Sequence, residues 1–318
     1  MPASLFLLSQ PVSGQSGLSK VGVPSMGFVY DGSQSAIRPI LGLPGAAIVG
    51  APLDPGFAVA RAAVAAQRQF VLAASGDDGR ARVIVVQDSG LTVRPVDGAL
   101  ISPDRMILSP SATSAILYRR DAARLQIVTG LPEAPVVARE IALDDSGSAH
   151  ALAVSDDGAL ALYAAGAGPL WLFDSNGGRA QLSLPAAVAA VTFRPGGSDA
   201  LAVVRTGELY MIQADGGTAY YGRIAGDDPS DPVAVQLSRD GARAYVAYAG
   251  GSIAVFDSAA GVSKTVSCEC SPTGLEPVNS AMFRVNDGSS GPVMLYDGSG
   301  ADPRVWFVPV DRTQGNAQ

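Results

Sequence analysis

The sequence predicts an all-β fold, a β-propeller of about six four-stranded blades, with seven blades as the alternative. Three observations support this prediction: the chain contains a repeated unit, its apolar residues stand in short runs, and 37 glycines and 22 prolines interrupt those runs. Of the 318 residues, 47% are hydrophobic and only 16% are charged, which favours a large core over long charged helices. We expect residues 1–318 to form one propeller domain, with 1–25 and 312–318 as loose ends.

The repeated unit is clearest in two segments, Ala151–Gly178 and Val233–Gly261. Both contain an apolar strand, a Ser-x-Asp-Gly turn, a second apolar strand, a glycine-rich turn and a third strand that ends in Phe-Asp-Ser. Weaker copies lie at Ala62–Gly90, Met106–Gly130, Val191–Gly217 and Ala281–Asp311. The positions expected on the third strands are Val86, Val128, Phe173, Ile212, Phe256 and Val308. They recur at roughly 40–50 residues, which is the period of propeller blades.

The residue types within these units fit the strands of a propeller blade. The apolar runs often lack strict alternation, which is typical of strands that are buried on both faces. Small residues at Ala62–Ala66 and Ala186–Ala190 suit first strands near a crowded axis. The dipeptides Asp157-Gly158 and Asp240-Gly241 predict tight hairpins, because glycine readily adopts a positive φ. Fourth strands are expected after the third, for example at Leu91–Val96, Arg179–Leu184 and Val262–Ser267.

The ends of the chain are expected to close the ring. The pattern predicts that the last repeat stops after a third strand at Arg304–Val310, and that Phe28–Asp31 and Ile37–Leu43 form a hairpin near the N-terminus. We therefore expect an N-terminal strand to complete the last blade. Closure of this kind removes the open sheet edges that favour aggregation.

Composition argues against several functional classes. The net charge of −7 is unsuited to binding nucleic acid, which requires a basic surface. No segment is long and apolar enough to span a membrane. Cys268 and Cys270 are two residues apart, near the upper limit for a bridge within a strand, so we interpret them as reduced or loosely paired thiols at a strand end. No cluster of histidine or cysteine predicts a metal site, and no motif predicts a cofactor.

One segment carries a resemblance to a known repeat. Ala244–Gly261 resembles the YVTN repeat of bacterial propellers, which carries Tyr-Val-Thr-Asn, a glycine-containing turn and a strand that ends in an apolar residue and aspartate. Tyr245 and Val246 match that pattern, whereas Ala247 and Tyr248 replace the threonine and asparagine. The resemblance implies a propeller fold. YVTN-like proteins are often exported or located at the cell surface, and some relatives are lactonases.

A second resemblance concerns the ends of two third strands. Phe173-Asp174 and Phe256-Asp257 resemble the Trp-Asp ending of WD40 blades, although the Gly-His pair of a full WD40 repeat is missing. Propellers host unrelated activities, so both resemblances bear on the fold more than on the function.

His150 is the only histidine, and any Ser-His-Asp or Cys-His arrangement must therefore include it. We expect it at the start of the first strand of a repeat, near a mouth of the central tunnel. It is either a ligand-contacting or acid–base residue or, as we favour, a histidine hydrogen-bonded at a junction between loop and strand. No catalytic residue is predicted. Asp77-Asp78 and the cluster from Asp227 to Asp231 lack a calcium-binding pattern, which favours solvated turn aspartates.

Charged residues concentrate on the loops of one predicted face of the propeller. This face carries both the turns between second and third strands and the links between blades. A rigid scaffold that presents polar loops is a common place for binding. An equally weighted interpretation is that charges collect where solvent is. The face is expected to carry Asp77, Asp78, Arg80, Arg119, Arg120, Asp121, Arg124, His150, Arg205, Asp227, Asp228 and Asp231. The candidate binding residues among them are His150, Arg119, Arg120, Arg205, Asp77, Asp78 and Asp228.

The leading functional hypothesis is a non-enzymatic binding or scaffold protein that presents this loop face to a protein, glycan or small-molecule ligand. One alternative is a lactonase-like hydrolase with a site at the tunnel mouth, and another is a structural module of the cell surface. We expect a monomer. The cellular compartment stays open, with an exported location favoured over a cytoplasmic one.

Overall fold

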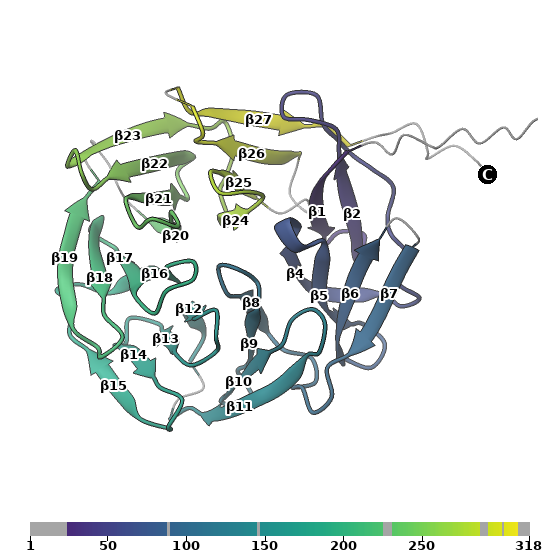
Figure 1. Cartoon of the computed structure of the whole chain (residues 1–318), viewed down its shortest axis with the longest axis horizontal. Helices are drawn as coiled ribbons and strands as arrows, with labels where there is room; N and C mark the ends of the chain where they lie inside the picture. Colours follow the sequence, from purple (N-terminus) through teal and green to yellow (C-terminus); the bar gives the residue numbers. More distant parts are fainter. Residues whose placement is uncertain are drawn as a thin grey trace, which may run out of the picture.

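The chain forms a ring of seven β-sheets around a central channel (Figure 1). The computed structural model describes residues 24–87, 90–144, 147–224, 231–286, 292–300 and 302–310. The predicted fold class is confirmed, and of the two predicted blade numbers the structure has the alternative, seven. Six sheets have four strands and the first has three. Most of the predicted loose ends, 1–25 and 312–318, lie outside the described residues, although a strand already begins at Ser25.

Each blade is an antiparallel meander whose first strand is innermost. Blades 1 and 2 comprise β1 (Ser25–Asp31), β2 (Ala36–Leu41) and β3 (Ile48–Val49), then β4 (Val59–Ala65), a 3₁₀ turn η1 (Ala66–Arg68), β5 (Phe70–Ser75), β6 (Ala81–Gln87) and β7 (Gly90–Pro95). Blades 3 and 4 comprise β8 (Arg105–Leu108), β9 (Ser114–Arg119), β10 (Arg124–Thr129) and β11 (Val136–Ala142), then β12 (Ala149–Val154), β13 (Ala161–Ala165), β14 (Leu170–Phe173) and β15 (Arg179–Leu182). Blades 5 and 6 comprise β16 (Val188–Phe193), β17 (Ala200–Val204), β18 (Glu208–Ile212) and β19 (Thr218–Arg223), then β20 (Pro232–Leu237), β21 (Arg243–Tyr248), β22 (Ser252–Asp257) and β23 (Val262–Ser267). Blade 7 comprises β24 (Glu276–Pro277), β25 (Met282–Arg284), β26 (Val293–Asp297) and β27 (Arg304–Val308).

The position of a strand within its blade explains its residue pattern. The second strand β5 has the sequence FVLAAS and is buried at every residue, because neighbouring blades cover both of its faces. The outermost strand β11, VVAREIA, alternates between exposed and half-buried residues, since only one of its faces meets a neighbour. The continuous apolar runs in the sequence are therefore the inner strands of the blades.

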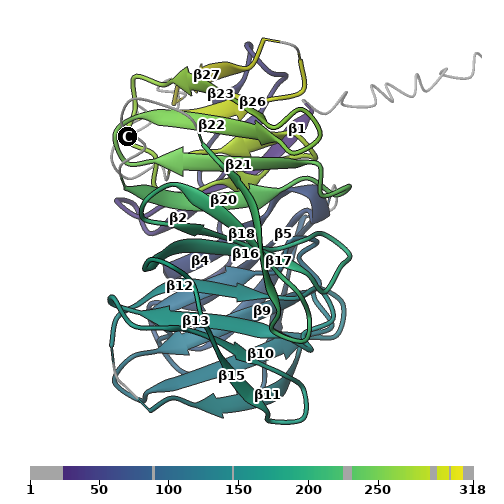
Figure 2. The ribbon, with the colours of Figure 1, turned by 90° about the vertical axis from the view of Figure 1, so that its left-hand side faces the viewer.

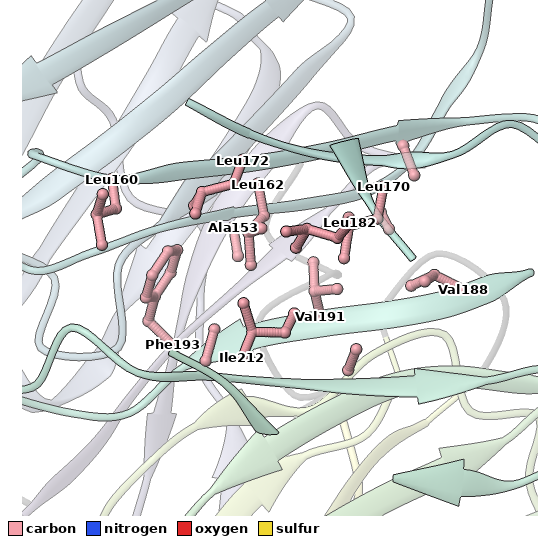
Figure 3. Close-up of a cluster of buried hydrophobic side chains, with 14 of the residues drawn as sticks. Ala153, Leu160, Leu162, Leu170, Leu172, Leu182, Val188, Val191, Phe193 and Ile212 are labelled. Atoms are coloured by element: carbon pink, nitrogen blue, oxygen red, sulfur yellow. The ribbon is translucent and has the colours of Figure 1, made fainter. Parts of the chain in front are cut away.

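Adjacent blades pack through side chains that interdigitate between their sheets. Figure 3 shows the cluster between blades 4 and 5, where Leu162, Leu172 and Leu182 face Val191 and Phe193. Leu162 and Phe193 are at most 1% exposed. Similar apolar clusters lie between the other pairs of neighbouring blades, so the core is a set of layers arranged around the ring.

The predicted Asp-Gly hairpins are present, and a serine stabilises each of them. In blade 4 the Ser155 hydroxyl donates to Asp157 Oδ1 at 2.6 Å, and the same carboxylate oxygen accepts the amide of Ala159. The hydrogen bond from Ser155 and that amide lower the pKa of Asp157. Gly158 follows with a φ of 72°, a value that side chains with a Cβ rarely adopt. The equivalent hairpin of blade 6 repeats these contacts with Ser238 and Asp240.

The ring closes by a route different from the predicted one. The N-terminal strands do not complete the last blade; they form blade 1, and blade 7 has four strands of its own. The two blades are joined by apolar packing that includes Ile40, Val49, Leu295 and Val308. The only backbone connection among the described residues is near Val49, whose amide donates to Pro309 O at 2.8 Å and which forms a parallel bridge with Val310.

The error in the closure comes from one missed strand. The innermost strand of blade 7, Glu276–Pro277, has only two residues and shows no periodicity that a sequence pattern could reveal. Without this strand, the sequence pattern places each later strand of blade 7 one position too close to the axis. Val308 therefore lies on a fourth strand, not a third, whereas the other five predicted third-strand residues lie where expected.

The interpretation of the cysteines as reduced or loosely paired is wrong, because Cys268 and Cys270 form a disulfide. β23 ends at Ser267, so the pair lies in the bent link between blades 6 and 7 and not on a strand. The bend brings the two Cα atoms to 5.1 Å, which is within the usual range for a disulfide.

The ring has two distinct faces, as the side view in Figure 2 shows. All innermost strands begin at the same face, which also bears the turns between second and third strands and the links between blades. We call it the loop face. The opposite face bears the remaining hairpins. Across the described ranges, no helix has the length and apolar character needed to cross a bilayer.

If side-chain packing between blades 1 and 7 holds the ring closed, truncating a buried side chain in that layer will destabilise the folded protein. We expect Leu295→Ala to lower the free energy of unfolding by about 2–5 kcal/mol, because Leu295 is fully buried. Leu43→Ala is the control, since Leu43 is 62% exposed, and should change it by less than about 0.5 kcal/mol. Urea denaturation followed by circular dichroism measures both, and equal losses would contradict the packing account.

Candidate functional site

Two adjoining cavities lie along the central channel, each of about 310 Å³. The central cavity is lined by all six innermost strands from β4 to β24, mostly through small or apolar residues such as Ala151, Ala190 and Ala234. The mouth cavity opens beside it and is lined by Tyr30 and by several ionisable residues. These are Arg61, Asp104, Arg105, Glu276 and Arg284. Arg105 and Glu276 line both cavities, so the two form a continuous space.

A β-bulge recurs where the innermost strands begin. The pairing register of blades 1, 2, 4, 5 and 6 skips one residue near the start of the first strand, at Met26, Ala60, His150, Ala189 and Val233. A bulge bends the strand and redirects the side chains beside it. His150 is therefore the one polar residue at a position that is otherwise apolar in these five blades.

His150 is held by the neighbouring blade. Its Nε2 lies 2.6 Å from the carbonyl oxygen of Val188, which can only accept, so this nitrogen carries the proton. Nδ1 is buried and has no hydrogen-bond partner within the described part of the chain. Burial lowers the pKa of His150 below its ordinary value of 6.5, and the positive charges of Arg205 and Arg105 lower it further. The imidazole is thus neutral at pH 7.

Arg105 connects two blades at the channel mouth. It lies at the start of β8, and its Nη1 donates to the carbonyl oxygens of Ala149 and His150 on β12, at 2.8 and 2.9 Å. Burial lowers the pKa of Arg105 below its ordinary value, as expected for a cation that is partly removed from water. Within the described ranges, no carboxylate lies within 4.0 Å of its guanidinium.

Four further ionisable residues line the mouth. Arg284 on β25 is buried, forms an ion pair with Glu276 and donates to Asn286 O at 2.6 Å. Arg61 on β4 is exposed, and no ion pair is formed by it in the portion that the structure describes. Asp104 Oδ2 accepts the backbone amide of Arg120 at 2.7 Å. The mouth therefore holds more cationic than anionic side chains, although the whole chain is acidic.

Those residues predicted for binding that the structure describes lie on the loop face, but most of them are bound to neighbouring groups. Arg119 forms a two-bond ion pair with Asp121, at 2.6 and 2.8 Å. Arg120 donates to the Ser148 hydroxyl at 2.8 Å, and Arg205 lies 3.6 Å from Asp231. Their role in binding a partner stays a prediction.

Asp77 and Asp78 lie on the same face, in the turn between β5 and β6. Asp78 is bound by Arg82, whose guanidinium lowers the pKa of Asp78 to about 2. Asp77 lies beside it, and its amide donates to Ser75 Oγ. Asp227 and Asp228 fall outside the described residues. Within the described ranges, no three histidine, cysteine, aspartate or glutamate residues are grouped closely enough to hold a metal ion.

Sequence analysis identified one residue of this site, His150, and missed Arg61, Arg105, Glu276 and Arg284. A signal for two of them was available. The predicted repeats that begin at Ala62 and Met106 each directly follow an arginine, and in the structure both arginines belong to the innermost strands. Glu276 lies on the two-residue strand that the pattern did not reveal.

The lowered pKa of His150 predicts a pH dependence of stability. Its folded pKa lies below its unfolded value, so the unfolded chain binds more protons between the two values and stability falls as the pH falls below about 6.5. As this is the only histidine, NMR titration of its imidazole should give one midpoint below 6.5. The His150→Gln variant should gain stability relative to the wild type as the pH falls through this range. A midpoint at or above 6.5 would contradict the prediction.

Comparisons with known proteins extend to the fold but not to a family. No family model matches the chain, and no curated protein matches its sequence. The chain is similar in structure to a solved protein described as "KlHsv2 with loop 6CD replaced by a Gly-Ser linker", with a TM-score of 0.56 and 11% sequence identity. The match covers 90% of this chain and 98% of that chain. Likeness at this identity shows the propeller fold alone, and the YVTN and WD40 resemblances stay predictions.

Proposed function

We propose that this protein is a non-enzymatic binding propeller that receives its ligand at the channel mouth on the loop face. The observation that carries the proposal is the mouth cavity, about 310 Å³ in volume, where ionisable side chains from β4, β8, β24 and β25 converge. A mostly apolar cavity with a few convergent polar groups is the usual form of a ligand site. The rest of the channel, lined by residues such as Ala190 and Val235, provides that apolar part.

The size of the mouth narrows the kinds of ligand that fit. A cavity of about 310 Å³ accommodates a small molecule, or one protruding group of a larger partner. A protein or glycan would therefore reach these residues only with a side chain or a terminal unit. On the surrounding loops of the same face, charged residues such as Arg119 and Asp121 form ion pairs with each other. These loops therefore offer a ligand fewer unpaired groups than the mouth does.

The fold supports this role because the site sits on rigid elements. The mouth residues stand on the first strands of four blades or beside them, and each strand is fixed by packing against its neighbours. Groups held in this way lose little freedom when a ligand binds. The hydrolase and cell-surface alternatives stay predictions, since no contact at the mouth favours either of them.

Gly274 allows the site to be blocked without disturbing the fold. It lines both cavities, and a Cβ built there meets no atom within 4 Å. We expect Gly274→Trp to weaken binding of a ligand at least about tenfold, because the indole would occupy the mouth. Isothermal titration calorimetry with a panel of neutral sugars, amino acids, carboxylates and phosphates measures this.

Gly250→Trp is the matched control. Gly250 lies in the turn between β21 and β22 on the same face, has equally open surroundings and lines neither cavity. It should bind every compound as the wild type does. A panel in which no compound binds, or binding that Gly274→Trp leaves unchanged, would contradict the proposed function.

A further inference from the structure

Internal repetition shows which residue the fold itself requires at the channel mouth. In blades 3 to 6 the same backbone hydrogen bond closes the first hairpin: an amide N–H donates to the carbonyl oxygen five residues later. The donating residues, in the order of the blades, are Ser109, Ser155, Arg194 and Ser238. The residue four places before each of these donors is Arg105, Ala151, Ala190 and Ala234, respectively. Three of the four blades thus place alanine at this position, and blade 3 places arginine there.

Arg61 occupies the equivalent position in blade 2. In blades 4, 5 and 6 the alanine is the first residue paired after the bulge, and Arg61 is the first residue paired after the bulge of β4. In blade 1 the same place is taken by Gly27. Each blade with a visible bulge therefore has glycine or alanine here except blade 2. Two adjacent blades, 2 and 3, replace a small residue with arginine.

The two substitutions are not needed for packing. The alanine in the other blades lies in the apolar layer that faces the following blade. Arg105, which is partly withdrawn from water, loses hydration that alanine does not have to lose, and this loss disfavours the folded state, whereas Arg61 is exposed and stays hydrated. Arg61 recovers no ion pair in the described part of the chain, and Arg105 recovers only two carbonyl contacts made through one nitrogen. A local departure from the repeat at the expense of stability is typical of a functional position.

The neighbouring acids do not neutralise these two arginines. Glu276 is bound by Arg284, and Asp104 accepts a backbone amide. The remaining N–H groups of Arg61 and Arg105 are donors on a planar guanidinium, whose geometry matches the oxygens of a carboxylate or phosphate. The positive charge of Arg105 reaches His150, whose pKa is lowered mainly by burial and further by Arg205 and Arg105.

We propose that the ligand is a small molecule with a carboxylate or phosphate group, and that Arg61 and Arg105 bind this group in the mouth cavity. This inference rests on the proposed function and adds the chemical class of the ligand. Charge-assisted hydrogen bonds in a cavity partly removed from water are stronger than those at an exposed rim. Both arginines line the same cavity, and the proposal places the anionic group of the ligand between them.

Calorimetric titrations with citrate, inorganic pyrophosphate and neutral maltose test the proposal and distinguish the two sources of negative charge. We expect citrate or pyrophosphate to bind, and Arg61→Gln to weaken that binding about tenfold or more. Arg61 is exposed and has no ion-pair partner in the described ranges, so this variant should fold normally, which circular dichroism verifies. Arg239→Gln is the matched control, because Arg239 is an exposed arginine on the hairpin of the opposite face.

Arg105 also contacts the backbone of β12, so a second variant separates binding from structure. Arg105→Lys keeps the charge but not the planar fork, whereas Arg105→Gln removes the charge. The Arg105→Lys variant should retain part of the affinity for the anion. The Arg105→Gln variant should lose at least as much of that affinity as Arg61→Gln does. In addition, a saturating anion should raise the NMR titration midpoint of His150, because it offsets the positive charge of Arg105.

The outcomes separate this inference from the proposed function. Anion binding that falls in Arg61→Gln and stays intact in Arg239→Gln supports the inference. Anion binding unaffected by Arg61→Gln, or no binding of citrate and pyrophosphate at millimolar concentration, overturns it. If only maltose binds and Gly274→Trp abolishes that binding, the proposed binding site is supported and the inference that its ligand is an anion is refuted. Binding that is insensitive to Gly274→Trp refutes both.

Discussion

The face-to-face packing of sheets around the axis is the constraint on which the rest of this structure depends. Each blade has two faces to bury, and only its two neighbours can cover them. Residues such as Leu117 and Val203, on middle strands, are therefore completely buried although the protein is a ring and not a compact sphere. The innermost strands are held from both sides, which gives the channel a rigid wall. A site on that wall needs no separate scaffold.

Packing also explains which parts of the fold the sequence predicts. The middle strands are recognisable because burial on both faces demands uninterrupted apolar runs, as in β5 and β21. The hairpins of blades 4 and 6 are recognisable because Ser-x-Asp-Gly satisfies a specific turn. β24 has two residues and β3 has two, and neither length carries a periodic signal. For this reason the fold class was predictable, whereas the blade number and the closure depended on elements that leave almost no pattern.

The candidate site was less predictable for a different reason. Charge density in the sequence pointed to the loops, and charged residues do lie there. In the structure, however, pairs such as Arg119–Asp121 and Arg82–Asp78 neutralise each other locally. A pair at an exposed position contributes little free energy and leaves little for a partner to bind. Arg61 and Arg105 stand out only when the blades are compared with one another, since an isolated arginine beside an apolar run is not a motif. The relevant signal is a difference between repeats.

The seam between blades 1 and 7 has a consequence for how such a ring can change in evolution. Many closed rings would be locked by a strand exchanged between the two ends of the chain. In the part of the chain that the structure describes, blades 1 and 7 are separate sheets, and the joint between them consists of an apolar layer like those between the other neighbours, together with a backbone bridge at Val49. A duplicated or deleted unit would therefore meet the same kind of surface on either side. The number of blades, and with it the width of the pore, is free to vary without a redesigned joint.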